Sequence, residues 1–236
     1  MMRFVRFWLA ALGMTLYWGS RALWASWRGV QDVPGGIYER ATYNWSRGIL
    51  RACRISVRVE GAGQVTELPA VFVANHVSMI DIWALVVGLP VVPRFIMKKE
   101  LLKVPLLGAA ARDAGHIVID RQSLPAAFEA YDRAAEVIRR GASACVFAEG
   151  TRSRTGRLLP LKKGPFVLAI AAGVPVVPVL VEGSFELMPR LALAPQPGVV
   201  TLRFGAPIPT AGLGYDVRDD LSRRARAALV ALGARE

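Results

Sequence analysis

Short runs of apolar residues alternate with longer amphipathic segments from residue 52 onward. Most of the runs are bounded by Gly, Pro or Asp, and several are rich in valine and isoleucine, which is typical of buried strands. We expect strands at residues 55–59, 70–74, 117–119, 144–148, 176–181 and 199–204. Helical periodicity predicts helices at residues 80–87, 124–140, 165–172 and 216–232. This alternation predicts an α/β domain, residues 52–236, with a mixed, largely parallel sheet covered by helices.

The first 51 residues have a different pattern. An uncharged stretch at residues 7–20 lies between Arg6 and Arg21, and Pro34-Gly35-Gly36 separates it from a second predicted helix at residues 37–51. Residues 1–60 hold five of the six tryptophans and nine arginines. Indole and guanidinium groups both tolerate the headgroup layer of a bilayer. We therefore expect residues 1–51 to form a membrane-binding hairpin of two helices.

The sequence leaves open how this hairpin meets the membrane. As a helix the uncharged stretch is about 21 Å long, short of the ~30 Å hydrocarbon core, which favours an embedded or interfacial helix. If the flanking arginines reach back to the surface and the helix continues through Trp27, it just spans the core. A cleaved signal peptide fits poorly, because no clear small-residue cleavage site precedes Arg21 and Arg28. An ordinary hairpin that packs its apolar face on the rest of the protein is the remaining alternative.

Composition and charge narrow the classes of function. The chain has 236 residues, of which 53% are hydrophobic, so it can bury a core and is not a disordered chain. Its net charge of +12 favours an anionic partner: nucleic acid, a phosphorylated small molecule or an acidic membrane surface. Two cysteines and two histidines exclude a disulfide framework and a Cys-rich or His-rich metal centre. The sequence contains neither glycine-rich nucleotide fingerprint and no nucleophile elbow.

A polar cluster of Asn75, His76, Ser78 and Asp81 follows the predicted strand at residues 70–74. Reactive groups of α/β proteins tend to lie at such strand ends. A helix would hold His76 and Asp81 about 140° apart, so their contact requires His76 in the turn and Asp81 one turn into the helix. Ser78 suits the helix N-cap. A carboxylate on one imidazole nitrogen leaves the other as a base that can activate a hydroxyl, and a purely structural histidine is an equal alternative.

A second cluster follows the predicted strand at residues 144–148. Here the backbone N–H groups of Gly150 and Thr151 can turn toward an anion. The Arg152 guanidinium can bind phosphate oxygens, and Glu149 can hold Arg152 in place. Four more basic residues follow before the helix near residue 165. The alternative is a solvated basic loop, which is the better interpretation for an arginine-rich loop taken alone.

Two other segments carry weaker signals. The strand at residues 117–119 ends in Asp120-Arg121, where Arg121 is either a second phosphate ligand or part of a surface ion pair. His116 lies at the opposite end of that strand, and we expect it to be structural. Residues 174–179, Val-Pro-Val-Val-Pro-Val, predict an apolar strand that shapes the core.

In this order and spacing, the segments together resemble the glycerolipid acyltransferases, and most closely the 1-acylglycerol-3-phosphate acyltransferases. That family carries N-H-x-S-x-x-D, a strand that ends in Asp-Arg, F-P-E-G-T-R-S and V-P-V-V-P-V. The similar segments here are residues 75–81, 120–121, 147–153 and 174–179. The resemblance covers roughly residues 50–210. Ala148 stands where the family has proline, and we expect it to shape the turn without loss of activity.

The resemblance implies transfer of a fatty acyl group from an acyl thioester to the sn-2 hydroxyl of lysophosphatidic acid, which gives phosphatidic acid. It implies that His76 is the general base and that Asp81 orients it. It also implies substrate-binding residues in the other motif positions: Asn75, Ser78, Arg121, Glu149, Gly150, Thr151 and Arg152. It implies no metal and no bound cofactor, since acyl-CoA or acyl carrier protein serves as a co-substrate. The oxyanion stabiliser stays open between a backbone N–H and Lys98.

The implied partners are membrane phospholipids, lysophosphatidic acid and acyl-CoA or acyl carrier protein, and no nucleic acid. The implied location is the cytoplasmic face of the inner or plasma membrane. One alternative is an enzyme that acylates another lysolipid, such as lyso-ornithine lipid or a lysophospholipid with a larger headgroup. A second is a non-catalytic module that binds anionic lipid. A third is a nucleic-acid-binding protein, which only the charge suggests and which the tryptophan-rich N-terminus opposes.

Overall fold

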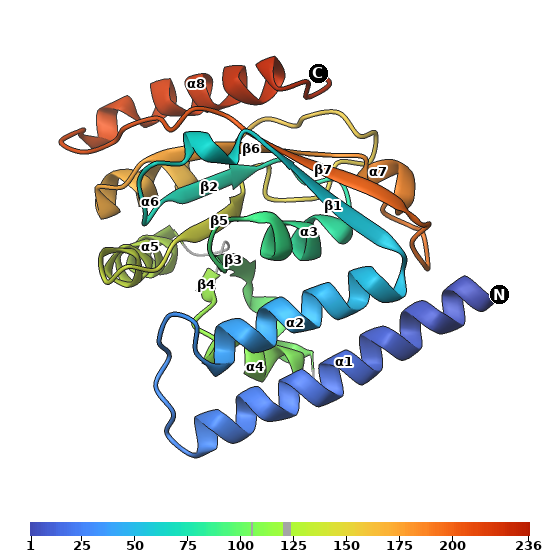
Figure 1. Ribbon diagram of the computed structural model, residues 1–236. Coiled ribbons are helices and arrows are strands. Elements are labelled where there is room, and N and C mark those ends of the chain that lie inside the picture. Colours follow the sequence, from blue (N-terminus) through green and yellow to red (C-terminus); the bar gives the residue numbers. More distant parts are fainter. Residues whose placement is uncertain (105, 120–123) are drawn as a thin grey trace.

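The computed structural model describes residues 1–104, 106–119 and 124–236. Two helices, α1 (Met2–Trp27) and α2 (Ile37–Ala52), precede the alternating part of the chain (Figure 1). The strands are β1 (Ile55–Glu60), β2 (Val71–Ala74), β3 (Arg94–Lys98), β4 (Ile117–Ile119), β5 (Ala144–Phe147), β6 (Val176–Glu182) and β7 (Gly198–Phe204). The other α-helices are α3 (Ile80–Gly88), α4 (Leu107–Asp113), α5 (Leu124–Arg139), α6 (Gly164–Ala172), α7 (Ser184–Leu187) and α8 (Arg218–Ala231). The 3-10 helices are η1 (Ala62–Gln64), η2 (Lys99–Lys103) and η3 (Tyr215–Val217).

The described strands form one sheet in the order β1-β7-β6-β2-β5-β3-β4. Every neighbouring pair is parallel except β6 and β7, so the predicted mixed, largely parallel sheet is confirmed. The paired strands β2 and β5 run in register from Val71 opposite Ala144 to Ala74 opposite Phe147. Their carboxyl ends therefore lie side by side, and both polar clusters of the sequence begin at this one edge.

Helices cover both faces of the sheet, and the alternation of side chains along β2 shows how. Phe72 and Ala74 belong to the apolar cluster that includes residues of α2 and α3. Val71 and Val73 point to the other face and join residues of α5, α6 and α8. Since successive side chains of a strand point to opposite faces, an uninterrupted apolar run is what a strand buried on both sides requires.

Among the described strands and α-helices, three were not predicted from the sequence: β3, α4 and the short α7. The apolar part of β3 is only three residues long, because Arg94 and Lys98 stand at its ends. In α4 the stretch Gly-Ala-Ala-Ala has too little contrast between its faces to show a helical period. Packing against the rest of the molecule, which a local pattern does not record, determines these elements.

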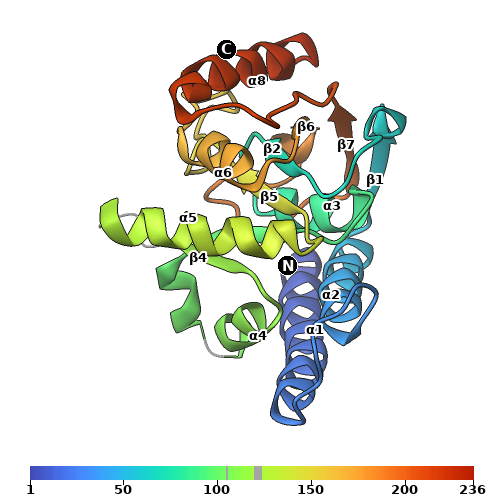
Figure 2. The same ribbon diagram turned by 90° about the vertical axis from the view of Figure 1, so that its left-hand side faces the viewer.

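The two N-terminal helices form a hairpin that projects from the α/β domain (Figures 1 and 2). Helix α2 contributes the buried Ile49 and Leu50 to the main core. Helix α1 packs on α2 and α4, and large apolar side chains on its outer face, such as Leu9 and Leu12, stay exposed. Among the described helices, none combines the length and the apolarity that crossing a bilayer requires.

A buried guanidinium connects this hairpin to the sheet. Arg94 begins β3 and is 5% exposed. Its Nη2 lies 2.7 Å from a carboxylate oxygen of Asp32, in the loop between α1 and α2, and 3.7 Å from one of Glu39 on α2. Its Nη1 donates to the Ala114 carbonyl oxygen at 2.9 Å. One side chain thus joins the hairpin loop, the start of α2 and the end of α4.

Replacing Arg94 with methionine should lower the free energy of unfolding by roughly 2–3 kcal/mol, because two partly buried carboxylates lose their counter-charge. Equilibrium unfolding in urea measures the change. Arg112→Met is the matched control, since Arg112 is 66% exposed and its ion pair among the described residues is with the adjacent Asp113. We expect that control to stay within about 0.5 kcal/mol of wild type. Equal losses in the two variants would contradict a special role for Arg94.

Candidate active site

The centre of the site is a contact between His76 and Asp81. His76 lies in the turn after β2, and Asp81 lies in the first turn of α3. The imidazole Nδ1 and Asp81 Oδ2 are 2.8 Å apart. The arrangement that the five-residue spacing requires, with His76 in the turn and Asp81 pointing back from the helix, is therefore present.

Asp81 is completely buried, and four donors surround its carboxylate. Oδ2 accepts hydrogen bonds from the backbone N–H groups of Val77 and Ser78, each at 2.8 Å, besides His76. Oδ1 accepts one from the Ser184 hydroxyl at the start of α7. Sequence reasoning missed Ser184, because it lies 103 residues further along the chain and no local motif marks it.

The hydrogen bond to Asp81 sets the orientation and the tautomer of His76. A neutral imidazole that donates from Nδ1 keeps Nε2 as an acceptor. Among the described residues Nε2 meets no hydrogen-bond partner. The His76 ring also stacks on Phe147, with ring centroids 3.8 Å apart and planes inclined by 13°. This second contact was not predicted, although Phe147 ends the strand beside β2.

Asn75 and Ser78 hold the turn in place. The Asn75 side-chain amide exchanges two hydrogen bonds with the backbone of Val181, at 3.0 and 2.7 Å, as a paired strand residue would. The Ser78 hydroxyl donates to the Met188 carbonyl oxygen at 2.8 Å and accepts from the Ile80 N–H at 3.2 Å. Met79, not Ser78, is the N-cap of α3, so that prediction is wrong by one residue.

Glu149 supports the backbone of the same turn. Its carboxylate is buried, with Oε1 accepting from the His76 N–H at 2.6 Å and Oε2 from the Leu159 N–H at 2.7 Å. Among the described residues no ion pair joins Glu149 to Arg152, so the expectation that Glu149 holds Arg152 is wrong. The carboxylate points inward because buried backbone donors need an acceptor.

The rest of the second cluster forms a tight loop against His76. Gly150 has a φ of 74°, in the region that favours glycine, and its N–H donates to the Phe147 carbonyl oxygen at 3.0 Å. That N–H is engaged within the turn and is not directed at an anion as expected. The Ser153 N–H donates to the His76 carbonyl oxygen at 2.8 Å. The Thr151 side chain is exposed, and the Arg152 side chain is partly exposed.

A profile of the acyltransferase family matches residues 56–182. The chain belongs to the acyltransferase family. It is 31% identical to the 1-acyl-sn-glycerol-3-phosphate acyltransferase of Cocos nucifera, over 78% of this chain and 59% of that one. It is 30% identical to the enzyme of the same name from Saccharomyces cerevisiae, over 94% of this chain and 73% of that one. The family resemblance seen in the sequence motifs is confirmed.

A solved structure shows the same architecture. The crystal structure of the 1-acyl-sn-glycerophosphate (LPA) acyltransferase PlsC from Thermotoga maritima superposes with a TM-score of 0.79 at 25% identity. The match covers 100% of this chain and 96% of that one. By contrast, the chain spans three fifths or less of the length of the plant relatives from Cocos, Limnanthes and Brassica.

This chain departs from the family pattern at Ala148, and the structure shows the local consequence. The Ala148 N–H donates to the Ala74 carbonyl oxygen at 3.3 Å, a bond that proline lacks the hydrogen to make. Its carbonyl oxygen accepts from the Lys162 N–H at 2.7 Å. The alanine is buried and joins the ends of β2 and β5 behind the His76 turn.

The remaining predicted residues lie away from the His76 turn or are not described. Arg121, with Asp120, lies outside the described residues. His116 is structural as predicted: its Nδ1 accepts from the Phe95 N–H at 3.1 Å. Burial, and to a smaller extent Arg94, lower the pKa of His116 to about 4. Within the described ranges, no three His, Cys, Asp or Glu side chains are grouped to hold a metal ion.

Burial raises the pKa of Glu149 to about 7, and the two backbone N–H groups on its carboxylate oppose that rise. The folded protein thus holds this proton more tightly than the unfolded chain, whose ordinary value is 4.5. The contribution of Glu149 to stability is therefore complete below a pH of about 4.5 and is lost as pH rises through about 7.

Glu149→Gln should remove this pH dependence, because an amide does not titrate. The free energy of unfolding of wild type, measured relative to the variant in urea, should fall by up to about 3 kcal/mol as pH rises from about 4.5 to 7.5. A constant offset is also expected, since the amide NH₂ cannot accept one of the two hydrogen bonds. Parallel stability curves would show that Glu149 ionises at its ordinary pKa.

Proposed function

We propose that the protein transfers a fatty acyl group from an acyl thioester to the sn-2 hydroxyl of lysophosphatidic acid, with His76 as the general base. The observation that carries the proposal is the contact between His76 and the buried Asp81. Nδ1 of the imidazole lies 2.8 Å from Asp81 Oδ2, so Nε2 is the ring nitrogen that can accept a proton. The 1-acyl-sn-glycerol-3-phosphate acyltransferase names of the relatives support the reaction and the acceptor.

In this mechanism His76 Nε2 removes the proton of the acceptor hydroxyl as the oxygen attacks the thioester carbonyl carbon. The tetrahedral intermediate collapses, the carbon–sulfur bond breaks, and the thiolate takes the proton back from the imidazolium. Asp81 stabilises the imidazolium and keeps its ring in place. Among the described residues, no serine or cysteine side chain is hydrogen-bonded to Nε2 of His76, so direct transfer to the acceptor fits better than an acyl-enzyme. Thioesters of coenzyme A and of acyl carrier protein both suit this step.

We assign the acceptor phosphate to Arg152, with Arg121 and the Thr151 backbone as further ligands. Arg152 precedes Ser153, whose N–H holds the His76 carbonyl oxygen, so the guanidinium is attached close to the base. Among the described residues, Arg152 forms no ion pair that would compete for it. Glu149 contributes indirectly, by holding the His76 backbone, since a buried carboxylate would repel a phosphate.

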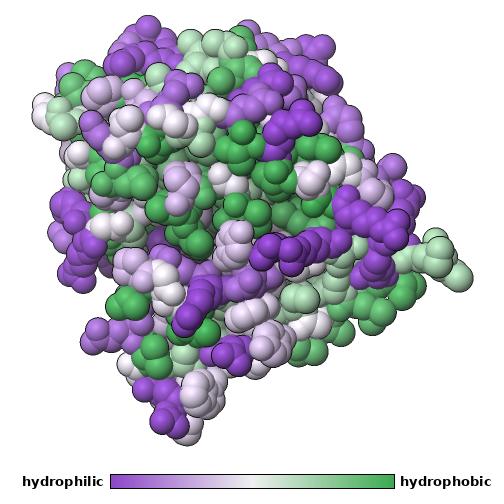
Figure 3. Space-filling model, in the orientation of Figure 1, coloured by the Kyte–Doolittle hydropathy of each residue, from purple (hydrophilic) through white to green (hydrophobic). Residues whose placement is uncertain are grey.

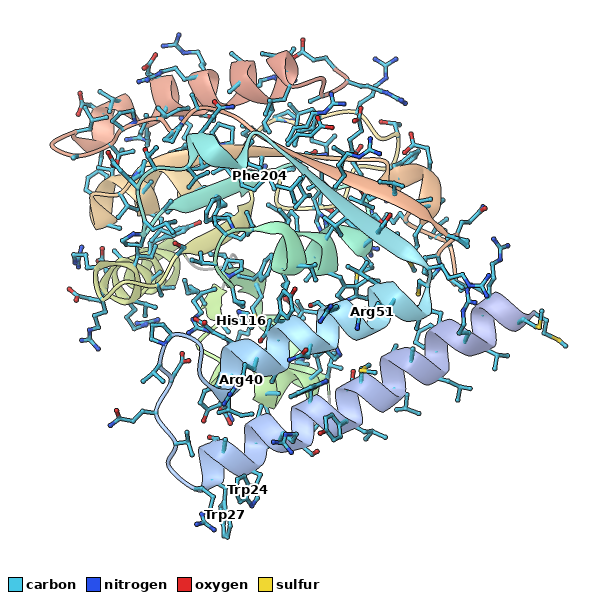
Figure 4. The ribbon with its side chains drawn as sticks, viewed as in Figure 1. Trp24, Trp27, Arg40, Arg51, His116 and Phe204 are labelled. Atoms are coloured by element: carbon cyan, nitrogen blue, oxygen red, sulfur yellow. The ribbon has the colours of Figure 1, made fainter. Side chains whose placement is uncertain are left out.

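We assign membrane binding to the outer face of α1. Val5, Trp8, Leu9, Leu12 and Leu16 are exposed there at helical spacing, and Figure 3 shows apolar surface along the lower right edge where α1 runs. At the other end of the helix, Trp24 and Trp27 point away from the body of the protein (Figure 4). An apolar face with terminal tryptophans suits the interface of a bilayer. The cytoplasmic face is proposed because acyl thioesters are made on that side.

Replacing His76 with alanine should lower acyl transfer by about 10²–10⁴-fold, since the hydroxyl loses its base. Purified wild type and variant receive an acyl thioester and, in separate reactions, lysophosphatidic acid and three other lysolipids. Mass spectrometry measures the diacyl products. Arg112→Met, on the exposed side of α4, is the control and should keep wild-type activity.

Each other result of this experiment points to a different function. Acylation of another lysolipid by wild type would keep the chemistry and replace the acceptor. Equal activity of wild type and His76→Ala would make the histidine structural. No product from any acceptor would favour a non-catalytic lipid-binding module.

Arg152→Ala should raise the KM for lysophosphatidic acid by about tenfold to a hundredfold with a smaller change in kcat, because a charge-assisted hydrogen bond to phosphate is lost. Arg223→Ala is the matched control, since Arg223 is 78% exposed on α8 and pairs with Asp220. Initial rates against acceptor concentration give both constants. An unchanged KM would remove Arg152 from the phosphate site.

A further inference from the structure

The segment between α7 and β7, residues 188–197, presents two leucines to solvent. Leu191 is 90% exposed and Leu193 is 69% exposed. The alternate residues Ala192 and Ala194 face inward and pack against the main core cluster. The segment therefore packs on the core through its alanines and holds two leucines outward, which is unfavourable in water unless another phase or molecule covers them.

Hydrogen bonds fix this segment to the turn after β2, which carries His76. The Met188 carbonyl oxygen accepts from the Ser78 hydroxyl at 2.8 Å, two residues from His76. The Gln196 N–H donates to the Leu187 carbonyl oxygen at 2.8 Å and closes the base of the segment. The preceding helix α7 supplies Ser184 to the Asp81 carboxylate. The position of the two leucines and that of the catalytic turn are thus linked.

The same segment extends the apolar face of α1. The Trp8 indole N–H donates to the Leu193 carbonyl oxygen at 3.1 Å, across 185 residues of sequence. Figure 1 shows this orange loop reaching toward the N-terminal end of α1. Exposed arginines stand near each part of the surface, Arg3 on α1 and Arg190 beside Leu191.

We propose that Leu191 and Leu193 insert into an anionic phospholipid bilayer as a second membrane contact beside α1. The proposal rests on the membrane role assigned to α1 under the proposed function. A bilayer is the occupant that this surface fits, because it combines projecting aliphatic side chains, an interfacial tryptophan and flanking arginines. The contact has a mechanical effect. A single interfacial helix can roll about its axis, whereas a second contact off that axis stops the rotation and sets the depth of the His76 turn.

Site-specific fluorescence tests the proposal without reference to acyl transfer. Cysteine replaces Leu191, or Leu213 in the matched control, and each variant is labelled with the environment-sensitive fluorophore NBD. The native Cys53 and Cys145 are buried, so the label attaches to the introduced thiol. Leu213 is also an exposed leucine, in the turn before α8, and Figures 1 and 2 both place α8 at the opposite end of the molecule from α1.

With mixed phosphatidylcholine–phosphatidylglycerol vesicles, we expect a blue shift and quenching by bilayer-embedded nitroxides at position 191, and neither at 213. Vesicle sedimentation should show affinity about tenfold lower for Leu191→Asp/Leu193→Asp, with Leu213→Asp unchanged.

Three outcomes would overturn the proposal, and a fourth would separate it from the proposed function. Vesicle binding by wild type without a signal at position 191 would reject the second contact and leave the α1 contact and the proposed function intact. A signal that grows with protein concentration in the absence of vesicles would show that a second copy of the chain covers the leucines. Equal binding to pure phosphatidylcholine vesicles would reject the anionic lipid. Insertion at position 191 by a protein that acylates no lysolipid would support this inference while the proposed function fails.

Discussion

Removing the Asp81 carboxylate from water is the constraint on which the rest of the site depends. A buried carboxylate costs several kcal/mol unless hydrogen-bond donors replace its hydration. Here the donors come from the imidazole, from two consecutive backbone N–H groups of the turn, and from Ser184. Satisfying this one group therefore fixes the turn after β2, the start of α3 and the start of α7 relative to one another. The rigid position of His76 is a result of that requirement.

The sequence predicted the sheet and both clusters because their signals are local. Runs such as residues 70–74 are apolar throughout, as strands buried on two faces must be, and the polar groups follow directly in the chain. It did not predict β3 or α4, whose contacts are distant in sequence. The errors at the site have the same origin. The spacing of Glu149 and Arg152 suggested a local ion pair, whereas burial directed the carboxylate to backbone donors of His76 and Leu159.

The N-terminal hairpin shows a similar division between local and distant information. The uncharged run at residues 7–20 and the Pro34-Gly35-Gly36 break predicted two helices, and both helices are present. The face that each presents is decided by partners in other parts of the chain. Ile49 and Leu50 of α2 enter the core, and Arg94 of β3 holds the loop that carries Asp32. Because α2 packs between α1 and the core, the side of α1 that faces away from α2 is exposed to solvent.

Three hydrogen bonds join the loop after β5 to the end of β2 and the turn that follows it. The His76 N–H donates to the Glu149 carboxylate, the Ser153 N–H to the His76 carbonyl oxygen, and the Ala148 N–H to the Ala74 carbonyl oxygen. The two segments therefore behave as a single piece. In the proposed reaction, one segment supplies the base and the other supplies the phosphate ligand, so their separation acts as a molecular ruler. In that reaction, such a ruler selects the acceptor by the number of bonds between phosphate and hydroxyl.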